Sequence, residues 1–249
     1  MIDTTVQEKN ITFPTDSKLQ SKIIVWCWKI STRYGLSLRR SYKRELKGII
    51  KAINFSRGVR KAKIVNKARR RLKTIAATLV REVKRKLSPP DLEVCRERLA
   101  LFDRVLKQKK KDKAKIYSLH EPGTLCIAKG KSHKPYEFGS KVCFVVGKKA
   151  GVIVGARNFD RNLYDGDTVE ETVKMMSRIL DYKPGLGIAD KGFRGRKTIE
   201  GVNILTPANQ SRKLSESEKR RNKKRHCRRS AIEPVIGHLK LISEWPVTF

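Results

Sequence analysis

The stretch Lys141-Val-Cys-Phe-Val-Val146 and the stretch Gly151-Val-Ile-Val-Gly-Ala156 decide the fold of this chain. Both are short apolar runs rich in β-branched residues and bounded by glycine and lysine, a pattern typical of strands. Only a few residues separate them, which suits the connection of two antiparallel strands. The sequence therefore predicts a β-hairpin over 141–156.

The elements outside this hairpin set the order of the chain. We expect a strand over 1–6, helices over 17–116, a strand at 126–128, a helix over 169–180, strands at 185–189 and 201–205, and a terminal helix. Hairpin strands followed by strand–helix alternation imply a mixed sheet with helices on its faces. This order predicts an α/β chain with a ribonuclease H-like mixed sheet and a long basic helical insertion after the first strand.

The helical segment has the clearest periodicity. Apolar residues recur at steps of three and four along one helix predicted from Arg57 to Leu87, which Ser88-Pro89-Pro90 ends. Thr15 or Asp16 is expected to cap the first helix. We therefore divide the chain into a first strand and loop (1–16), a basic helical insertion (17–116), the rest of the ribonuclease H-like domain (117–240) and a divergent tail (241–249).

The charge of the chain points to a polyanionic partner. Its 249 residues include 59 Lys and Arg against 24 Asp and Glu, a net charge of +35. Such an excess favours nucleic acid, with strongly salt-dependent binding. The apolar run Ile23–Trp28 is too short to span a membrane, and no secretory signal opens the chain, so we expect a cytoplasmic protein. The five scattered cysteines are expected to be reduced core residues.

The terminal segment has the spacing His226-x2-Arg229-x3-Glu233-x6-Lys240. On a helix, residues three, four or seven apart share a face, so one carboxylate would lie among cations. That arrangement suits a site where the carboxylate binds a metal ion and the cations bind a phosphate. The alternative is structural: Ser230-x-x-Glu233 is also a capping box that would satisfy a helix N-terminus.

Strand order offers two partners for Glu233. Asp3 lies in the first strand and Asp190 at the carboxyl end of the strand 185–189, and these strands are expected to be neighbours. Three carboxylates at one point suit Mg²⁺ or Mn²⁺. Two such ions, roughly 3.5–4 Å apart, would clamp the attacking and leaving oxygens of a phosphoryl transfer. Arg229 and Lys240 would then hold the phosphate backbone.

Each acidic motif also has a simpler interpretation. Asp190 before Lys-Gly192 could belong to an ordinary strand-end turn. We interpret Asp165 and Asp167 as turn and N-cap residues, with Asp167-x-x-Glu170 as a second capping box. His133, beside two lysines, is expected to be a phosphate contact or a residue of a solvated turn.

Five motifs together resemble bacterial insertion-sequence DDE transposases. They are Asp3-Thr-Thr-Val-Gln-Glu-Lys9, Lys129-Gly-Lys-Ser-His-Lys-Pro-Tyr-Glu-Phe-Gly139, Tyr164-Asp-Gly166, Ala189-Asp-Lys-Gly-Phe-Arg-Gly195 and Arg229-Ser-Ala-Ile-Glu-Pro-Val-Ile-Gly-His-Leu-Lys240. The resemblance implies cut-and-paste transposition of double-stranded DNA, with Asp3, Asp190 and Glu233 as the metal-binding triad. It also implies a homodimer in the active complex and association with the bacterial nucleoid. DNA contacts are expected from Lys131, His133, Lys134, Arg194, Arg229 and Lys240.

The chain departs from the family pattern in three places. His226 replaces the Tyr of the Tyr-Arg-Glu-Lys signature, only Met1 and Ile2 precede Asp3, and 241–249 does not resemble the family's continuation. We therefore expect a copy truncated at both ends, and whether it still acts as an enzyme is left open at this point. The alternative function is a non-enzymatic basic protein that binds nucleic acid by charge alone.

Overall fold

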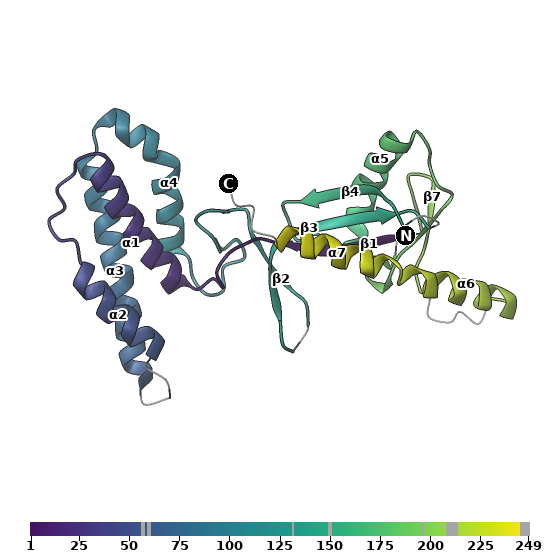
Figure 1. Ribbon diagram of the computed structural model, residues 1–249, viewed down its shortest axis with the longest axis horizontal. Helices are drawn as coiled ribbons and strands as arrows, with labels where there is room; N and C mark the ends of the chain where they lie inside the picture. The colour runs from purple at the N-terminus through teal and green to yellow at the C-terminus, as the bar shows by residue number, and fades with distance from the viewer. Residues whose placement is uncertain are drawn as a thin grey trace. The chain divides into compact units, whose positions relative to one another are not determined.

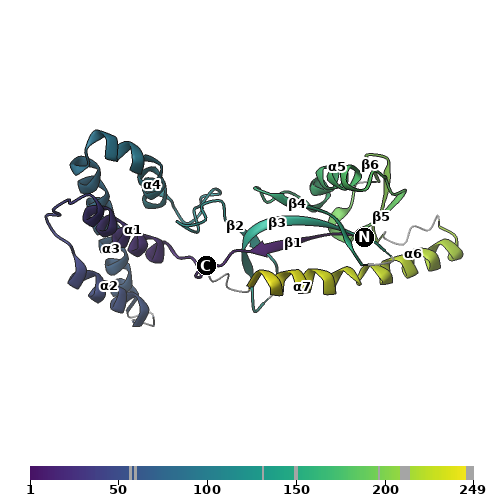
Figure 2. The ribbon, with the colours of Figure 1, turned by 45° about the horizontal axis from the view of Figure 1, so that its top comes forward.

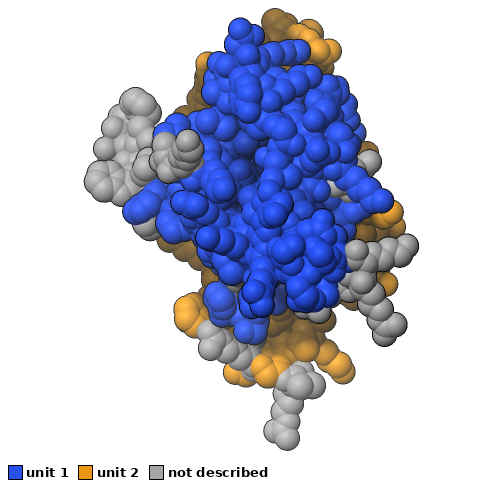
Figure 3. All heavy atoms as spheres, turned by 90° about the vertical axis from the view of Figure 1, so that its right-hand side faces the viewer, with its two compact units in different colours: residues 1–10, 124–249 blue, residues 11–123 orange. Residues whose placement is uncertain are grey.

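The chain forms two compact units. The computed structural model describes residues 1–55, 58, 61–130, 132–148, 151–195, 197–207 and 214–244. Unit 1 comprises Met1–Asn10 and Thr124–Phe249, and unit 2 comprises Ile11–Gly123; Figure 3 colours them separately. Unit 2 therefore lies, in sequence, between the first and second strands of unit 1. No helix in the described part of the chain is long and apolar enough to cross a membrane.

Unit 2 contains four described helices. They are α1 (Asp16–Arg33), α2 (Lys43–Phe55), α3 (Ala62–Lys86) and α4 (Pro89–Lys107) (Figure 1). Thr15 caps α1 through a hydrogen bond that its side chain accepts from the Lys18 backbone N–H, as the sequence predicted. The apolar stripe of α3 packs against α1 and α4, and the largest fully buried side chains there are Ile23, Ile24, Leu72, Ile75, Leu79, Leu99 and Phe102.

The helical prediction was wrong for 108–116, which is not helical. The backbone of Ile116 is fixed instead by the Gln108 side chain, whose Oε1 accepts from the Ile116 N–H at 3.0 Å. The Gln108 side-chain amide also donates to the Ile116 carbonyl at 3.3 Å. Successive lysines between these residues repel one another, so this closed loop is favoured over another helical turn.

Glu82 is a buried carboxylate that ties α3 to the segment before α2. Its side chain is 7% exposed. It accepts a hydrogen bond from the Arg39 backbone N–H at 2.7 Å and forms an ion pair with Lys86 at 2.8 Å. The hydrogen bond from Lys86, followed by that from the Arg39 backbone, lowers the pKa of Glu82. A lowered folded-state pKa adds stability above the unfolded pKa, and this stability is lost as pH falls through the folded value.

We expect Glu82→Gln to lower the free energy of unfolding by about 1–3 kcal/mol at pH 7, because the charge-assisted bonds are lost. The difference from wild type should shrink as the pH falls below about 4, near the ordinary Glu pKa. Urea denaturation at pH 7, 4 and 3 measures this. Glu93→Gln, at an exposed position of α4, is the control and should change little. An equal difference at all three pH values would contradict the assigned role.

The described residues of unit 1 form two sheets in place of the single mixed sheet expected. In the first, β3 (Tyr136–Val146) pairs antiparallel with β1 (Ile2–Glu8), β2 (Leu125–Ala128) and β4 (Ile153–Phe159). In the second, β7 (Val202–Leu205) pairs parallel with β5 (Leu186–Ile188) and antiparallel with β6 (Thr198–Ile199). The predicted hairpin is β3 and β4.

Side-chain packing joins β1 to β5, although the two strands belong to different sheets. A Cβ added at Gly187 of β5 would lie 2.9 Å from Ile2 Cδ1. The Ile2 side chain therefore fills the space over Gly187, and the two strands meet through it. The two strands are therefore adjacent, as predicted, but they are not joined by backbone hydrogen bonds.

Helices cover both faces of the β1–β3–β4 region (Figure 2). α5 (Val169–Leu180) buries Val169, Val173 and Met176 against one face. α7 (Ile232–Glu244) buries Ile232 with Met1 and Val146 on the other. The terminal helix is interrupted, because α6 (Glu216–Arg229) ends before α7 begins.

The cysteines follow the core prediction only in part. Cys27, Cys95 and Cys143 are buried, Cys126 is half-buried and Cys227 is exposed. The prediction is therefore wrong for Cys227, because no residue of α6 is buried against the rest of unit 1.

Candidate active site

Asp3 and Asp190 line one pocket of about 350 Å³ in unit 1. Asp3 is on β1, where it pairs with Phe144 of β3, and Asp190 immediately follows the short strand β5. The pocket is also lined by Thr4, Lys129, Lys141, Asn162 and Asp165, among others. Two of the three predicted acids are thus brought together from segments far apart in the sequence.

Asp3 is a partly buried carboxylate held in place by two donors. Its side chain is 17% exposed, Oδ1 accepts from the Thr4 backbone N–H at 2.8 Å, and Oδ2 accepts from Arg229 Nη1 at 3.1 Å. Burial raises the pKa of Asp3, the Arg229 charge lowers it, and the nearby Asp190 charge raises it again. The net shift is upward, so this carboxylate favours a cation as its neighbour.

Asp190 caps the short 3-10 turn Lys191–Phe193. Its Oδ1 accepts from the Gly192 backbone N–H at 2.7 Å, so the turn interpretation is correct for its local geometry. Gly192 leaves room for two carboxylates, because an added Cβ would lie 2.6 Å from Asp165 Oδ2 and 3.0 Å from Asp190 Oδ1 and would make these side chains shift. The turn and the position of the carboxylate in the pocket are compatible.

Asp165 is a third acid of the pocket that sequence reasoning assigned only to a turn. Its Oδ1 accepts from Thr4 Oγ1 at 2.8 Å and pairs with Lys141 Nζ at 2.6 Å. The N-cap of α5 is Thr168 and not Asp167, and the Thr168 side chain donates to the Asp165 carbonyl. The motif Tyr164-Asp-Gly166 was the available signal. Asp165 thus links β1 and β3 to the loop of Asp190.

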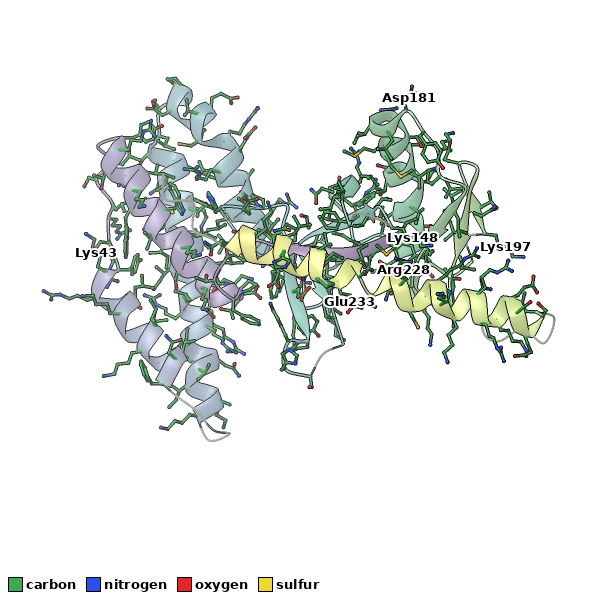
Figure 4. The ribbon with its side chains drawn as sticks, turned by 45° about the vertical axis from the view of Figure 1, so that its right-hand side comes forward. Lys43, Lys148, Asp181, Lys197, Arg228 and Glu233 are labelled. Carbon is green, nitrogen blue, oxygen red and sulfur yellow. The ribbon has the colours of Figure 1, made fainter. Side chains whose placement is uncertain are left out.

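Glu233 lies in the first turn of α7, with Arg229 between it and Asp3. Its side chain is 65% exposed, and Arg229 Nη2 lies 3.8 Å from Glu233 Oε1. The same guanidinium binds Asp3. Figure 4 shows Glu233 near the junction of α6 and α7. Within the described ranges, no three His, Cys, Asp or Glu side chains are grouped so that they could hold a metal.

The capping-box alternative for Glu233 does not match the geometry at this junction. Ser230 Oγ donates to the Cys227 carbonyl at 2.7 Å, and the Glu233 N–H donates to the Ser230 backbone carbonyl at 3.0 Å. A reciprocal capping box is found instead at the start of α6, between Ser215 and Glu218. Glu233 is therefore left to interact with Arg229.

His226 faces the same junction as a neutral ring. Burial lowers its pKa, and the Arg229 charge lowers it further. A ring with a lowered pKa is not a strong phosphate ligand at neutral pH.

The predicted DNA contacts lie in different surroundings. His133 and Arg194 are exposed, and Arg194 accepts a hydrogen bond from Tyr164 Oη through its backbone carbonyl. Lys134 Nζ pairs with Glu8 at 2.6 Å. Lys240 Nζ lies 3.7 Å from the buried carboxylate of Glu137, which Lys129 approaches at the same distance. Lys131 lies outside the described residues.

The donors of the pocket fit a divalent cation. Asp3 and Asp190 supply carboxylate oxygens, which hard cations prefer. Burial raises the pKa of Asp3, and repulsion from the Asp190 charge adds to that rise. The Arg229 guanidinium already supplies positive charge at Asp3. A cation bound by both aspartates would replace that charge and relieve the repulsion.

Comparison with known proteins identifies a family. The family model described as Transposase DDE domain matches residues 91–242, more than half of the chain. The matched residues include Asp190 and Glu233 but not Asp3. No curated protein and no solved structure matches the chain.

Proposed function

Because the chain belongs to the transposase DDE domain family, we propose that it cleaves and transfers DNA strands at the ends of an insertion sequence, in a divalent-metal-dependent reaction. The observation that carries the proposal is the shared pocket of Asp3 and Asp190, which β1 and β5 deliver from different sheets. Family membership supports a role for these two carboxylates in the metal-dependent cleavage of DNA strands. The fold expected of such a domain is ribonuclease H-like, and the mixed α/β architecture of unit 1 is compatible with it.

Asp3, Asp190 and Glu233 are the proposed metal ligands, with Mg²⁺ or Mn²⁺ as the cation. Divalent cations bound there would supply the charge that activates a water or 3′-hydroxyl nucleophile and stabilises the departing 3′-oxygen. Asp3 and Asp190 provide the rigid part of the site, since each is fixed by a backbone N–H donor. Glu233 is exposed enough to turn toward them.

Arg229 is proposed to exchange partners during this reaction. It binds Asp3 at 3.1 Å, and it would be displaced when a cation neutralises that carboxylate. The displaced guanidinium can then bind a DNA phosphate, for which its planar donors are well suited. The pocket lysines Lys129 and Lys141 add positive charge around the same point. We further propose two copies in the active complex and association with the nucleoid.

A nicking assay tests the function. We expect the protein to nick supercoiled plasmid DNA that carries the sequence flanking its own gene, with Mg²⁺ or Mn²⁺ and not with EDTA. Glu233→Gln should reduce nicking by at least about 10-fold, because a carboxylate ligand becomes a neutral amide. Glu93→Gln, at an exposed position of α4, is the control with the same change in charge and should nick at the wild-type rate.

The alternative makes a different prediction for the same samples. A protein that binds nucleic acid by charge alone would bind the plasmid without nicking it, and Glu233→Gln would leave binding unchanged. Folded protein that binds DNA but shows no metal-dependent nicking would overturn the proposed activity.

A further inference from the structure

Helix α6 is basic, and none of its residues is buried. Eight of its 14 residues are Lys or Arg, and its two acids lie in the first turn. A helix that is polar all round gains little from packing, and like charges four residues apart destabilise it. Such a helix is favoured when a polyanion neutralises it.

Five cations of α6 lie on one exposed face. They are Arg220, Arg221, Lys223, Lys224 and Arg228, which we call the α6 cationic face. Steps of three, four and seven connect them, so they project from one side of the helix. The opposite side carries the half-buried residues Asn222, His226 and Arg229. The helix therefore has one side turned to unit 1 and one turned to solvent.

Internal ion pairs do not neutralise this face. Lys219 pairs with Glu216 at 2.6 Å, and Arg229 pairs with Asp3, but neither belongs to the face. Glu218 is engaged in the capping box with Ser215. Among the described residues, no ion pair joins an acid to any of the five cations, and the charge of Arg221 only helps to lower the pKa of Glu218, after the backbone and side-chain hydrogen bonds from Ser215. Their charge remains available to a partner.

The position of α6 in unit 1 shows where that partner would lie. α6 and α7 follow nearly one line, and α6 extends beyond the strands (Figures 1 and 2). Its last residue, Arg229, contacts Asp3 of the carboxylate pocket. Figure 4 shows Arg228 at the same end of the helix. A polyanion lying along α6 would therefore reach the end of the helix at which Arg229 contacts the pocket.

We propose that the α6 cationic face binds the phosphate backbone of duplex DNA and leads it to the pocket of Asp3 and Asp190. The helix is about 20 Å long at roughly 1.5 Å per residue, and a duplex presents one charge per roughly 1.7 Å of axis. The face lacks the large apolar side chains that a membrane surface or a protein interface needs. This inference rests on the proposed function for the meaning of the pocket, but the binding itself needs no metal.

The first test compares two triple variants with the same change in net charge. One replaces Arg220, Lys224 and Arg228 with Gln. The control replaces the exposed Lys63, Lys67 and Arg70 of α3 with Gln. Fluorescence anisotropy with a 30-base-pair duplex (a length of about 100 Å at roughly 3.4 Å per pair) measures affinity from low to moderate salt.

We expect the α6 triple variant to bind at least about 10-fold more weakly. Its affinity should also depend less on salt, with the negative slope of log K against log salt becoming shallower by about 2.5. The control should retain most of its affinity. Equal losses in the two variants would overturn the proposal, because net charge rather than α6 would then determine binding. Far-UV circular dichroism checks that both variants fold.

The second test uses Cys227, the exposed cysteine within α6, as a reporter. We expect duplex DNA, without metal, to slow maleimide alkylation of Cys227 by at least about fivefold, since a bound backbone excludes the reagent. Labelling of the half-buried Cys126 is the internal reference. Unchanged alkylation of Cys227 at saturating DNA would overturn the proposal. Protection of Cys227 by DNA, together with no nicking when Mg²⁺ or Mn²⁺ is then added, would contradict the proposed function but support DNA binding by α6.

Discussion

Asp190→Asn is expected to reduce metal-dependent DNA nicking by at least about 100-fold. The substitution removes the negative charge and one strong oxygen ligand from the pocket. It should not unfold the turn, because the asparagine carbonyl can still accept the hydrogen bond that Asp190 accepts from the Gly192 N–H at 2.7 Å. The loss would therefore report on chemistry at the pocket and not on folding.

Asp181→Asn is the matched control for this prediction. Asp181 is exposed at the end of α5 in a left-handed conformation, with φ 49°, which asparagine tolerates well. Both variants lose one negative charge, so their DNA affinity should rise slightly and equally. Plasmid nicking with Mn²⁺ gives the rates, and anisotropy gives the affinities. If Asp190→Asn nicks as fast as Asp181→Asn, Asp190 is not a catalytic ligand.

Local signals in the sequence were sufficient for most helices and strands. The bounds of α5 are those predicted, 169–180, because a turn motif precedes an amphipathic run of the right length. The α3 stripe is confirmed because its apolar residues recur at steps of three and four, and the β3–β4 hairpin because two β-branched runs lie close together in the sequence. The two-residue strand β6 was not predicted, because its pairing with β7 depends on a turn rather than on any apolar run.

The site was less predictable, because its contacts are long-range. Asp165 lies in a sequence that favours a turn, and only the approach of Thr4 and Lys141 places its carboxylate in the pocket. Glu233 was expected beside Asp3, yet a guanidinium occupies the space between them. Helical spacing indicated that Arg229 and Glu233 share a face. It could not indicate that Asp3 would be the closer partner of that arginine.

The division of unit 1 into two sheets has a similar origin. Element order correctly predicted that β1 and β5 approach one another. Whether they share a ladder depends on the side chain between them, and Ile2 packs over Gly187. That contact still brings Asp3 and Asp190 to one pocket. The packing of β1 beside β5 therefore matters more for the site than backbone pairing between these strands.

Gly139→Ala is expected to separate β1 from β3 and to destabilise unit 1 by about 3 kcal/mol or more. A Cβ at Gly139 would lie 1.9 Å from the Gln7 carbonyl oxygen, 2.7 Å from the Gln7 carbonyl carbon and 2.9 Å from Glu8 Cα. All three are backbone atoms, so no side-chain rotation relieves the overlap. β1 carries Asp3, and nicking should be lost together with stability.

Gly147→Ala is the control, on the same hairpin. Its added Cβ would lie 3.6 Å from the Val152 carbonyl oxygen, an ordinary contact, and stability should change little. Hydrogen exchange followed by mass spectrometry distinguishes the two variants, because amide protection over Ile2–Glu8 reports on β1 pairing. We expect that protection to fall sharply in Gly139→Ala, while the helices of unit 2 keep theirs. Wild-type protection of β1 in Gly139→Ala would mean that Glu8 does not pair with Gly139. In that case β1 would have a different register on β3, and a shift by one residue would turn Asp3 away from Asp190.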